Sequence, residues 1–330
     1  MAPMNTNTIA PRHRHRRFGA VLLSAALISA TACSNNSPTD ALDTAVATST
    51  TVATAPSTTA ITTITTISPT PTVARPTETI DQLVSAESAQ VHVRCVGQGD
   101  TTVVLIAGFG GDTTGWVKVE PAIATRARVC SYDRPGTGTS GPATSTTTFL
   151  TQATELREVL STIGEPGPYL VVGHSFGGAE AVTFASLFAD EVIGVVLIDA
   201  PPTTWPAALC AVPDDGSEAA AMVHGTCTDS FLPTGNGEHL DVFTAFAKAT
   251  DVVTLGSIPM TVISAVVRTL PEGLAASEVV RLTHAWDDGQ QQWARLSTVS
   301  HVVPVENTGH HIELDHPDII IDQITSLLPA

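Results

Sequence analysis

The sequence predicts an α/β fold in which helices cover both faces of a mostly parallel sheet. Short apolar runs of strand type alternate with segments of helical spacing over residues 80–330. Several of these runs are apolar at almost every position, as expected for strands buried on both faces. One of them, Tyr169–Gly173, leads through Gly-x-Ser-x-Gly directly into a helical pattern. About 250 residues are ample for one large domain of this class.

Residues 1–33 have the layout of a secretory signal peptide. Basic residues 12–17 precede an apolar segment, Phe18–Ala32, which is too short for a comfortable membrane span. Small residues then lead to Cys33, and Ala30–Cys33 resembles the bacterial lipoprotein signal, in which the cysteine becomes the lipidated N-terminus. We therefore expect an exported protein attached to the cell membrane through Cys33. Plain secretion and an uncleaved anchor remain alternatives.

Residues 34–79 have the composition of a disordered stalk. Between Ser37 and Thr79, Thr, Ser and Pro make up 25 of 43 residues, with almost no large side chains. Such a segment cannot bury enough apolar surface to offset its ordering entropy. We expect it to tether the folded domain, residues 80–330, to the lipid anchor.

The charge of the remaining chain is strongly negative. After residues 1–33 there are 11 basic and 32 acidic residues, a net charge of −21. Such a charge argues against nucleic acid or anionic lipid as a partner. The only expected contact with the membrane is the N-terminal anchor.

The expected elements follow the alternation of β-branched apolar runs with segments of helical spacing. Gly97–Asp100 is a turn signal between the first two runs, and Gly164 ends the first clear helix. The runs that predict strands are 91–96, 102–107, 127–132, 169–173, 192–198, 260–264 and 302–306. The segments that predict helices are one ending near 126, then about 149–163, 176–189 and 277–297, and the residues after Pro317.

This regularity fails between Ala200 and about Ser257, where proline, glycine and acidic residues are frequent. An irregular insertion of this length in an α/β domain is typical of a lid over the cleft. We therefore expect a short lid, about residues 201–257, inserted after the sixth strand.

Ser175 is the candidate nucleophile in Gly173-His174-Ser175-Phe176-Gly177. A serine between a strand and a helix takes a sharp turn that exposes its Oγ, and only flanking residues without bulk allow that turn. The hydroxyl needs a base, and the base needs a carboxylate to fix its tautomer. His310, in a loop after the last strand, is the candidate base. We expect its neighbour His311 to point elsewhere.

Beyond Cys33 the chain has four cysteines, Cys95, Cys130, Cys210 and Cys227. An even number in an exported domain indicates two disulfides, for which three pairings are possible. The spacing matches no zinc template, so no metal is expected at these residues.

Four motifs in order make the chain similar to the α/β-hydrolase superfamily over essentially all of residues 80–330. They are Gly108-Phe109-Gly110-Gly111 with Trp116, Tyr132–Ser140, Gly173–Gly178, and Gly309-His310 followed by Asp315-His316-Pro317. The resemblance implies a serine nucleophile without metal or cofactor. It also implies an oxyanion hole made by the backbone N–H groups of Phe109 and Phe176, which is what acyl transfer needs.

The acid has two possible positions in this family. Many relatives carry it in the loop after the strand at 260–264, but residues 265–272 contain no aspartate and only Glu272 as a carboxylate. Other relatives carry it at the end of the preceding strand, where Asp199 stands. We expect Asp199 to orient His310, with Glu272 as the alternative acid. If Glu272 is the acid, Asp199 is a structural residue that caps its loop.

The resemblance also places the strands that carry Cys95 and Cys130 side by side, within bridging range. The expected pairs are therefore Cys95–Cys130 and Cys210–Cys227, the second closing a short loop inside the lid. For Asp133-Arg134 the family context implies a structural ion pair in a tight turn.

The expected function is cleavage of a small-molecule carboxylic ester by an exported serine hydrolase, through an acyl-enzyme intermediate. One alternative is an aminopeptidase or amidase, since Asp133–Gly136 also occurs in proline-iminopeptidase-like relatives. That activity would need a lid carboxylate to hold a free amine, and Asp214, Asp215 and Glu218 are the candidates. The other alternative is a non-catalytic envelope or binding protein on the same fold.

Overall fold

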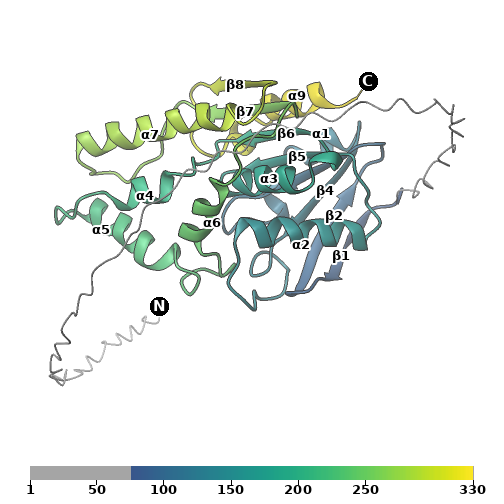
Figure 1. Ribbon diagram of the computed structural model, residues 1–330, viewed down its shortest axis with the longest axis horizontal. Helices are drawn as coiled ribbons and strands as arrows, with labels where there is room; N and C mark the ends of the chain where they lie inside the picture. Colours follow the sequence, from purple (N-terminus) through teal and green to yellow (C-terminus); the bar gives the residue numbers. More distant parts are fainter. Residues whose placement is uncertain (1–75, 330) are drawn as a thin grey trace, which may run out of the picture. The chain divides into compact units, whose positions relative to one another are not determined.

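An eight-stranded sheet runs through residues 76–329, which are the residues that the computed structural model describes (Figure 1). The strand order is β1-β2-β4-β3-β5-β6-β7-β8. The strands are β1 (Ile80–Ser85), β2 (Gln90–Val96), β3 (Thr102–Ile106), β4 (Arg128–Asp133), β5 (Tyr169–His174), β6 (Val192–Ile198), β7 (Met260–Ala265) and β8 (Ser300–Val305). β2 runs antiparallel to β1 and β4, and the other neighbouring pairs are parallel. The predicted mostly parallel sheet is confirmed.

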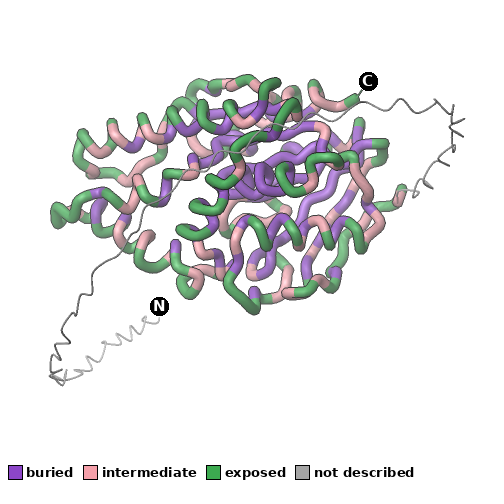
Figure 2. Tube along the Cα trace, in the orientation of Figure 1, coloured by how far each residue is buried: buried purple, intermediate pink, exposed green. Residues whose placement is uncertain are grey.

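Helices cover both faces of this sheet. α2, α3 and α7 share one apolar core with the strands, whereas α1 and α9 belong to the core on the opposite face. The helices are α1 (Glu120–Ile123), α2 (Phe149–Thr162), α3 (Phe176–Leu187), α4 (Trp205–Cys210), α5 (Glu218–Gly225), α6 (Val242–Ala249), α7 (Ala276–Ala294), α8 (Ile312–Asp315) and α9 (Pro317–Leu327), with the single turns η1 (Thr113–Trp116), η2 (Ala189–Glu191) and η3 (Thr226–Ser230). Figure 2 shows buried strands at the centre and exposed outer helix surfaces.

The central strands are apolar at successive positions because both of their faces are covered. In β3 the side chains of Val104 and Ile106 enter the core under α2 and α3, and those of Val103 and Leu105 enter the core under α1 and α9. All four are fully buried. The two-residue period of a strand therefore divides one apolar run between two cores.

Three elements differ from the sequence expectations. β1 was not predicted, because this edge strand is largely exposed and lacks a continuous apolar run. The helix expected up to residue 126 is instead the two short elements η1 and α1, with Pro121 in the first turn of α1. The segment between β6 and β7 contains α4, α5 and α6, although its pattern is irregular.

The segment predicted as a lid, residues 201–257, divides into two parts. α6 packs against α2 and α3, and its Phe246 is buried in their core. α4 and α5 instead belong to a separate small cluster that includes Trp205 and Trp286, the latter on α7. α6 is therefore part of the main core, whereas α4 and α5 form the more separate part of the insertion.

Both predicted cysteine pairs are bonded. Cys95 and Cys130 face each other across the antiparallel strands β2 and β4, and Cys210 at the end of α4 is joined to Cys227. The bridges close loops with sequence separations of 35 and 17 residues. On the chain-entropy model each contributes roughly 3–4 kcal/mol to stability.

The predicted signal peptide, Cys33 and the predicted stalk up to residue 75 lie outside the described residues. Residues 76–79, which end that stalk, contact the folded domain. The carbonyl oxygen of Thr77 accepts a hydrogen bond from Gln98 Nε2 (3.0 Å), and that of Glu78 accepts one from Arg128 Nη1 (2.9 Å). Within the described part of the chain, no helix is both long and apolar enough to cross a bilayer.

Candidate active site

Ser175 occupies the sharp turn between β5 and α3. Its φ of 53° is unusual for a residue with a side chain, and its N–H donates to the carbonyl oxygen of Ile198 on β6 (2.9 Å). The turn brings Gly173 and Gly177 so close that a Cβ on Gly173 would clash with the Gly177 carbonyl. A Cβ on Gly177 would lie 2.5 Å from the carbonyl oxygens of Ile106 and Ala107. The two glycines are therefore required by backbone contact.

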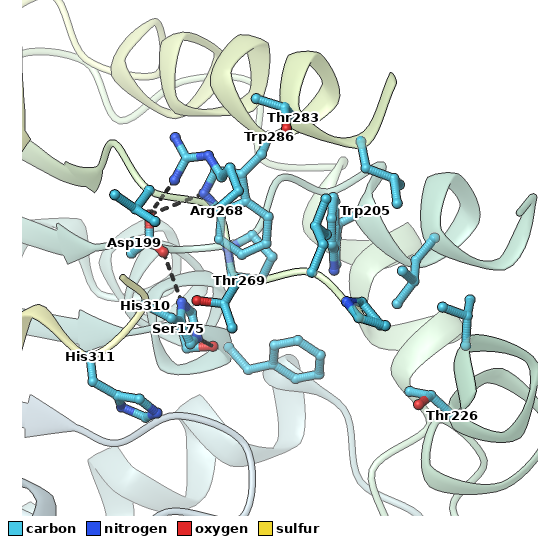
Figure 3. Close-up of a pocket in the computed structure, with 18 of the residues that line it drawn as sticks. Ser175, Asp199, Trp205, Thr226, Arg268, Thr269, Thr283, Trp286, His310 and His311 are labelled. Carbon is cyan, nitrogen blue, oxygen red and sulfur yellow. Dashed lines mark hydrogen bonds and ion pairs between the residues drawn. The ribbon is translucent and has the colours of Figure 1, made fainter. Parts of the chain in front are cut away.

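The structure brings Ser175, His310 and Asp199 together in one hydrogen-bonded chain (Figure 3). His310 Nε2 lies 2.8 Å from Ser175 Oγ, and His310 Nδ1 lies 2.8 Å from Asp199 Oδ2. An ionised Asp199 accepts from Nδ1–H, so Nε2 is left with the lone pair that accepts the serine proton. This arrangement can activate the hydroxyl as a nucleophile.

Asp199 follows β6 directly and is held from several sides. Its N–H donates to the Ile263 carbonyl of β7 (2.7 Å), and its side chain is only 3% exposed. While Oδ2 faces His310, Oδ1 accepts from Ala265 N (3.1 Å), Arg268 Nη1 (3.2 Å) and Trp286 Nε1 (3.1 Å). These three donors stabilise the carboxylate and fix its orientation.

Glu272, the alternative acid, lies elsewhere. It is exposed in the loop before α7 and does not line the cavity beside Ser175. Within the described residues its carboxylate has no hydrogen bond or ion pair. Of the two candidate acids, the structure brings only Asp199 to His310.

Sequence reasoning missed Arg268 and Trp286. Arg268 lies in the loop after β7, donates to Asp199 and to the exposed Asp287 (Nη2–Oδ1, 2.5 Å), and stands 5.7 Å over the Trp286 ring. Neither residue lies in a local sequence pattern that indicates its contact with Asp199.

His174, the residue before the nucleophile, also has an unpredicted position. Its Nε2–H donates to the carbonyl oxygen of His310 (2.9 Å), so it supports the backbone of the candidate base. Burial, together with the proximity of His310, lowers the pKa of His174 to about 3. The ring is therefore neutral at working pH.

Phe109 and Phe176, which carry the two expected oxyanion donors, line one cavity together with Ser175. The Phe109 and Phe176 rings pack together with centroids 5.2 Å apart, and Phe176 is the first residue of α3. In the region described, neither N–H forms a hydrogen bond, so both can donate to a ligand. The N–H of Phe176 also gains from the positive end of the helix dipole.

The loop that carries Phe109 is held by Arg134 and Glu238. Arg134 donates to the carbonyl oxygens of Ala107 (2.8 Å) and Gly108 (2.5 Å) and to Glu238 Oε2 (2.7 Å). Glu238 Oε1 accepts from Gly110 N (2.6 Å). The predicted ion pair between Asp133 and Arg134 is wrong, because this neighbouring pair points to different partners.

Asp133 and Glu180 complete the surroundings of this network. Asp133 accepts from the N–H groups of Thr113 (2.8 Å) and Thr139 (2.9 Å), which outweigh its burial and lower its pKa. Glu180 contacts Arg134 and the hydroxyl of Tyr132, and its complete burial raises its pKa to about 7. Glu238, rather than Glu180, is therefore the main carboxylate that balances the buried positive charge of Arg134.

Replacing Glu238 by glutamine should weaken both stability and turnover. Arg134 and Glu238 are both nearly inaccessible, and removal of one charge from a buried pair costs up to about 3–5 kcal/mol. The freed loop should also lower kcat more than it changes KM, because Phe109 N–H would act in the transition state. Urea unfolding and ester kinetics check this. Glu218→Gln, an exposed acid in the same insertion, is the matched control, and equal effects of the two would contradict the prediction.

An apolar cavity of about 370 Å³ opens beside Ser175 and His310. It is bounded by α4, α5, α7 and the loop after β7, and its lining includes Trp205, Leu209, Val223, Val267, Leu270 and Trp286. A second cavity of about 590 Å³ lies along the Phe109 loop and also reaches Ser175. Ser175, the candidate nucleophile, therefore lines both cavities.

Comparisons with known proteins agree with this architecture. A family model described as alpha/beta hydrolase fold matches residues 101–221. The uncharacterised protein YqjL of Bacillus subtilis (strain 168) is 27% identical over 224 residues, which are 68% of this chain and 82% of that protein. The 2-hydroxy-6-oxononadienedioate/2-hydroxy-6-oxononatrienedioate hydrolase 1 of Dechloromonas aromatica (strain RCB) is 32% identical over 132 residues, 38% of this chain but only 45% of that protein.

Among solved structures, carboxylesterase CesB (YbfK) of Bacillus subtilis matches with a TM-score of 0.53 and 15% identity, over 76% of this chain and 92% of that one. At this identity the likeness concerns the fold alone. Together with the matched family model and the observed sheet, it leads to one conclusion. The chain has the α/β-hydrolase fold.

Proposed function

We propose that the protein hydrolyses carboxylic esters, with Ser175 as nucleophile, His310 as general base and Asp199 as the acid that orients it. The observation that carries the proposal is the chain of two 2.8 Å hydrogen bonds from Ser175 Oγ through His310 to Asp199. Nucleophile, base and orienting group in this relation are the requirements for acyl transfer.

The reaction then has two halves. His310 Nε2 takes the proton of Ser175 as Oγ attacks the ester carbonyl carbon, and the N–H groups of Phe109 and Phe176 stabilise the oxyanion. Collapse of the tetrahedral intermediate breaks the ester bond, and His310 returns the proton to the leaving alcohol. Water, deprotonated by His310, next attacks the acyl-enzyme and releases the acid.

The comparisons support hydrolysis as the reaction class. The relative from Dechloromonas aromatica is a hydrolase by name, and the structural neighbour CesB is a carboxylesterase. The choice of ester rests on the apolar cavity, because it offers no group that would hold a charged amine. Asp199 is the one carboxylate among the described residues that line it, and both of its oxygens are engaged.

This lining also disfavours the aminopeptidase alternative. The insertion's acids Asp214, Asp215 and Glu218 are exposed and do not line the cavity. A panel of p-nitrophenyl esters and aminoacyl anilides separates the two activities. Faster cleavage of anilides with a free amine would overturn the ester proposal.

The cavity predicts a preference for an apolar acyl chain, which Val267→Trp should reduce. Val267 lines the cavity and its neighbour Val266 does not, although both are about half exposed. Each methylene that loses its place costs about 0.8 kcal/mol, so two or three should lower the octanoate-to-acetate ratio of kcat/KM by roughly tenfold or more. Val266→Trp is the matched control. An unchanged ratio in Val267→Trp would place the acyl chain elsewhere.

We further propose that the protein is exported and tethered by a lipid on Cys33. Two disulfides in one domain support an oxidising compartment. Cys33→Ser should therefore abolish incorporation of a clickable fatty acid and release the protein from the membrane fraction. Unchanged lipid labelling of Cys33→Ser would refute the anchor.

A further inference from the structure

We propose that His174, His311 and Glu313 form a binding site for a divalent transition-metal ion, for which Zn²⁺ is the best match. Each residue offers one ligand atom, and these atoms all lie within 4.8 Å of one another. The three residues come from the end of β5 and from the start of α8, directly beside His310. Two imidazoles and a carboxylate with room for a fourth ligand are a known zinc donor set.

The carboxylate of Glu313 already bridges the two rings. Its Oε1 lies 2.9 Å from His311 Nδ1, and its Oε2 lies 3.4 Å from His174 Nε2. Ligand atoms bound tetrahedrally at about 2.0–2.1 Å from zinc are separated by roughly 3.3–3.4 Å. A small closing movement of the exposed His311 ring would therefore complete the site.

Glu313 is a buried carboxylate with one oxygen that lacks a hydrogen bond. The residue is 5% exposed, and its Oε2 has no hydrogen-bond partner among the described residues. A buried carboxylate oxygen without a partner is costly.

A metal ion can reach this cluster from solvent. His174, His311 and Glu313 all line the second cavity, and the side chain of His311 is 63% exposed. In Figure 3 the His311 ring lies on the opposite side of Ser175 from Trp205, although His311 also lines the first cavity. The exposed His311 ring therefore opens the cluster to solvent.

Metal binding at this site should inhibit the enzyme. His174 Nε2–H now donates to the His310 carbonyl (2.9 Å), and coordination through Nε2 requires the tautomer with its proton on Nδ1. The His310 backbone then loses this hydrogen bond, and the base moves away from Ser175. This inhibitory effect rests on the proposed function, whereas the binding itself does not.

Calorimetric titration of the full chain with zinc sulfate tests the site. Wild type, His311→Ala, Glu313→Gln and the control His284→Ala are compared, with magnesium chloride as the control cation. His284 is exposed on α7 and lines neither cavity. The other histidines, including those in residues 1–33, are present in all four proteins. Only differences in Zn²⁺ binding between the proteins therefore report on the proposed site.

We expect one equivalent of Zn²⁺ to be lost or weakened at least about tenfold in His311→Ala and Glu313→Gln, since even an outer partner of a metal site is worth roughly 10–100-fold. His284→Ala should bind as wild type does, and Mg²⁺ should not compete. Identical titrations of the four proteins would overturn the site.

The rate of fluorophosphonate labelling with and without Zn²⁺ tests the inhibition separately. Zn²⁺ should slow labelling of wild type and His284→Ala but not of His311→Ala. A bound equivalent that leaves the labelling rate unchanged would overturn the inhibitory coupling. No labelling even without Zn²⁺ would contradict the proposed function and leave the binding result standing.

Discussion

Ser175→Ala should fold normally and lose roughly 10⁴–10⁶ in kcat, the range found when the nucleophile of a serine triad is removed. Ser175 donates to His310 and its hydroxyl fills no apolar core position, so its removal should not disturb packing. Ester kinetics together with a thermal unfolding curve check both halves of the expectation. The unchanged unfolding midpoint is needed, because only then does the lost rate report on chemistry.

His310→Ala should lose a similar factor, and the double variant should lose little more. Residues that act as one unit are strongly non-additive, because either deletion already abolishes the proton transfer. Independent, multiplying losses would instead mean that Ser175 and His310 contribute to different steps. Full esterase activity in Ser175→Ala would overturn the mechanism.

Asp199→Asn should leave the fold intact and reduce kcat by a factor approaching the ~10⁴ seen when a triad aspartate is changed to asparagine. Ala265, Arg268 and Trp286 all donate to Oδ1, so they should hold the amide oxygen in that position. The amide NH₂ then faces His310 Nδ1 and imposes the wrong tautomer. The measurement is kcat at saturating ester, with circular dichroism as the folding control.

Glu272→Gln is the matched comparison, since it makes the same change of a carboxylate to an amide at an exposed position. It should cost little, because Glu272 contributes only a surface charge. A larger loss of kcat in Glu272→Gln than in Asp199→Asn would mean that the orienting acid lies in the loop after β7. Small and nearly equal losses would mean that His310 is oriented by another group.

Local sequence signals predicted most of the fold and the candidate nucleophile, and the candidate base and acid were predicted with them. Gly173 and Gly177 are dictated by close backbone contacts, so the turn around Ser175 could be recognised from a few consecutive residues. The continuous apolar runs required a sheet covered on both faces. Asp199 was identified through the family resemblance, because some relatives carry the acid at the end of the corresponding strand.

Contacts between segments far apart in the sequence could not be predicted from local sequence patterns. Arg268 and Trp286 meet Asp199 across 69 and 87 residues of sequence, and Glu238 meets Arg134 across 104. None of these side chains has a local pattern that names its partner. The exposed strand β1 was missed for a related reason, since an edge strand has little apolar surface to reveal it.

Covalent labelling by a fluorophosphonate probe, followed by peptide mass mapping, tests the proposed nucleophile most directly. The account predicts one adduct, on the peptide that carries Ser175, with loss of ester hydrolysis in proportion to labelling and no adduct in Ser175→Ala. Ester hydrolysis that continues at full rate after complete labelling of Ser175, or an adduct that forms on another serine, would contradict it.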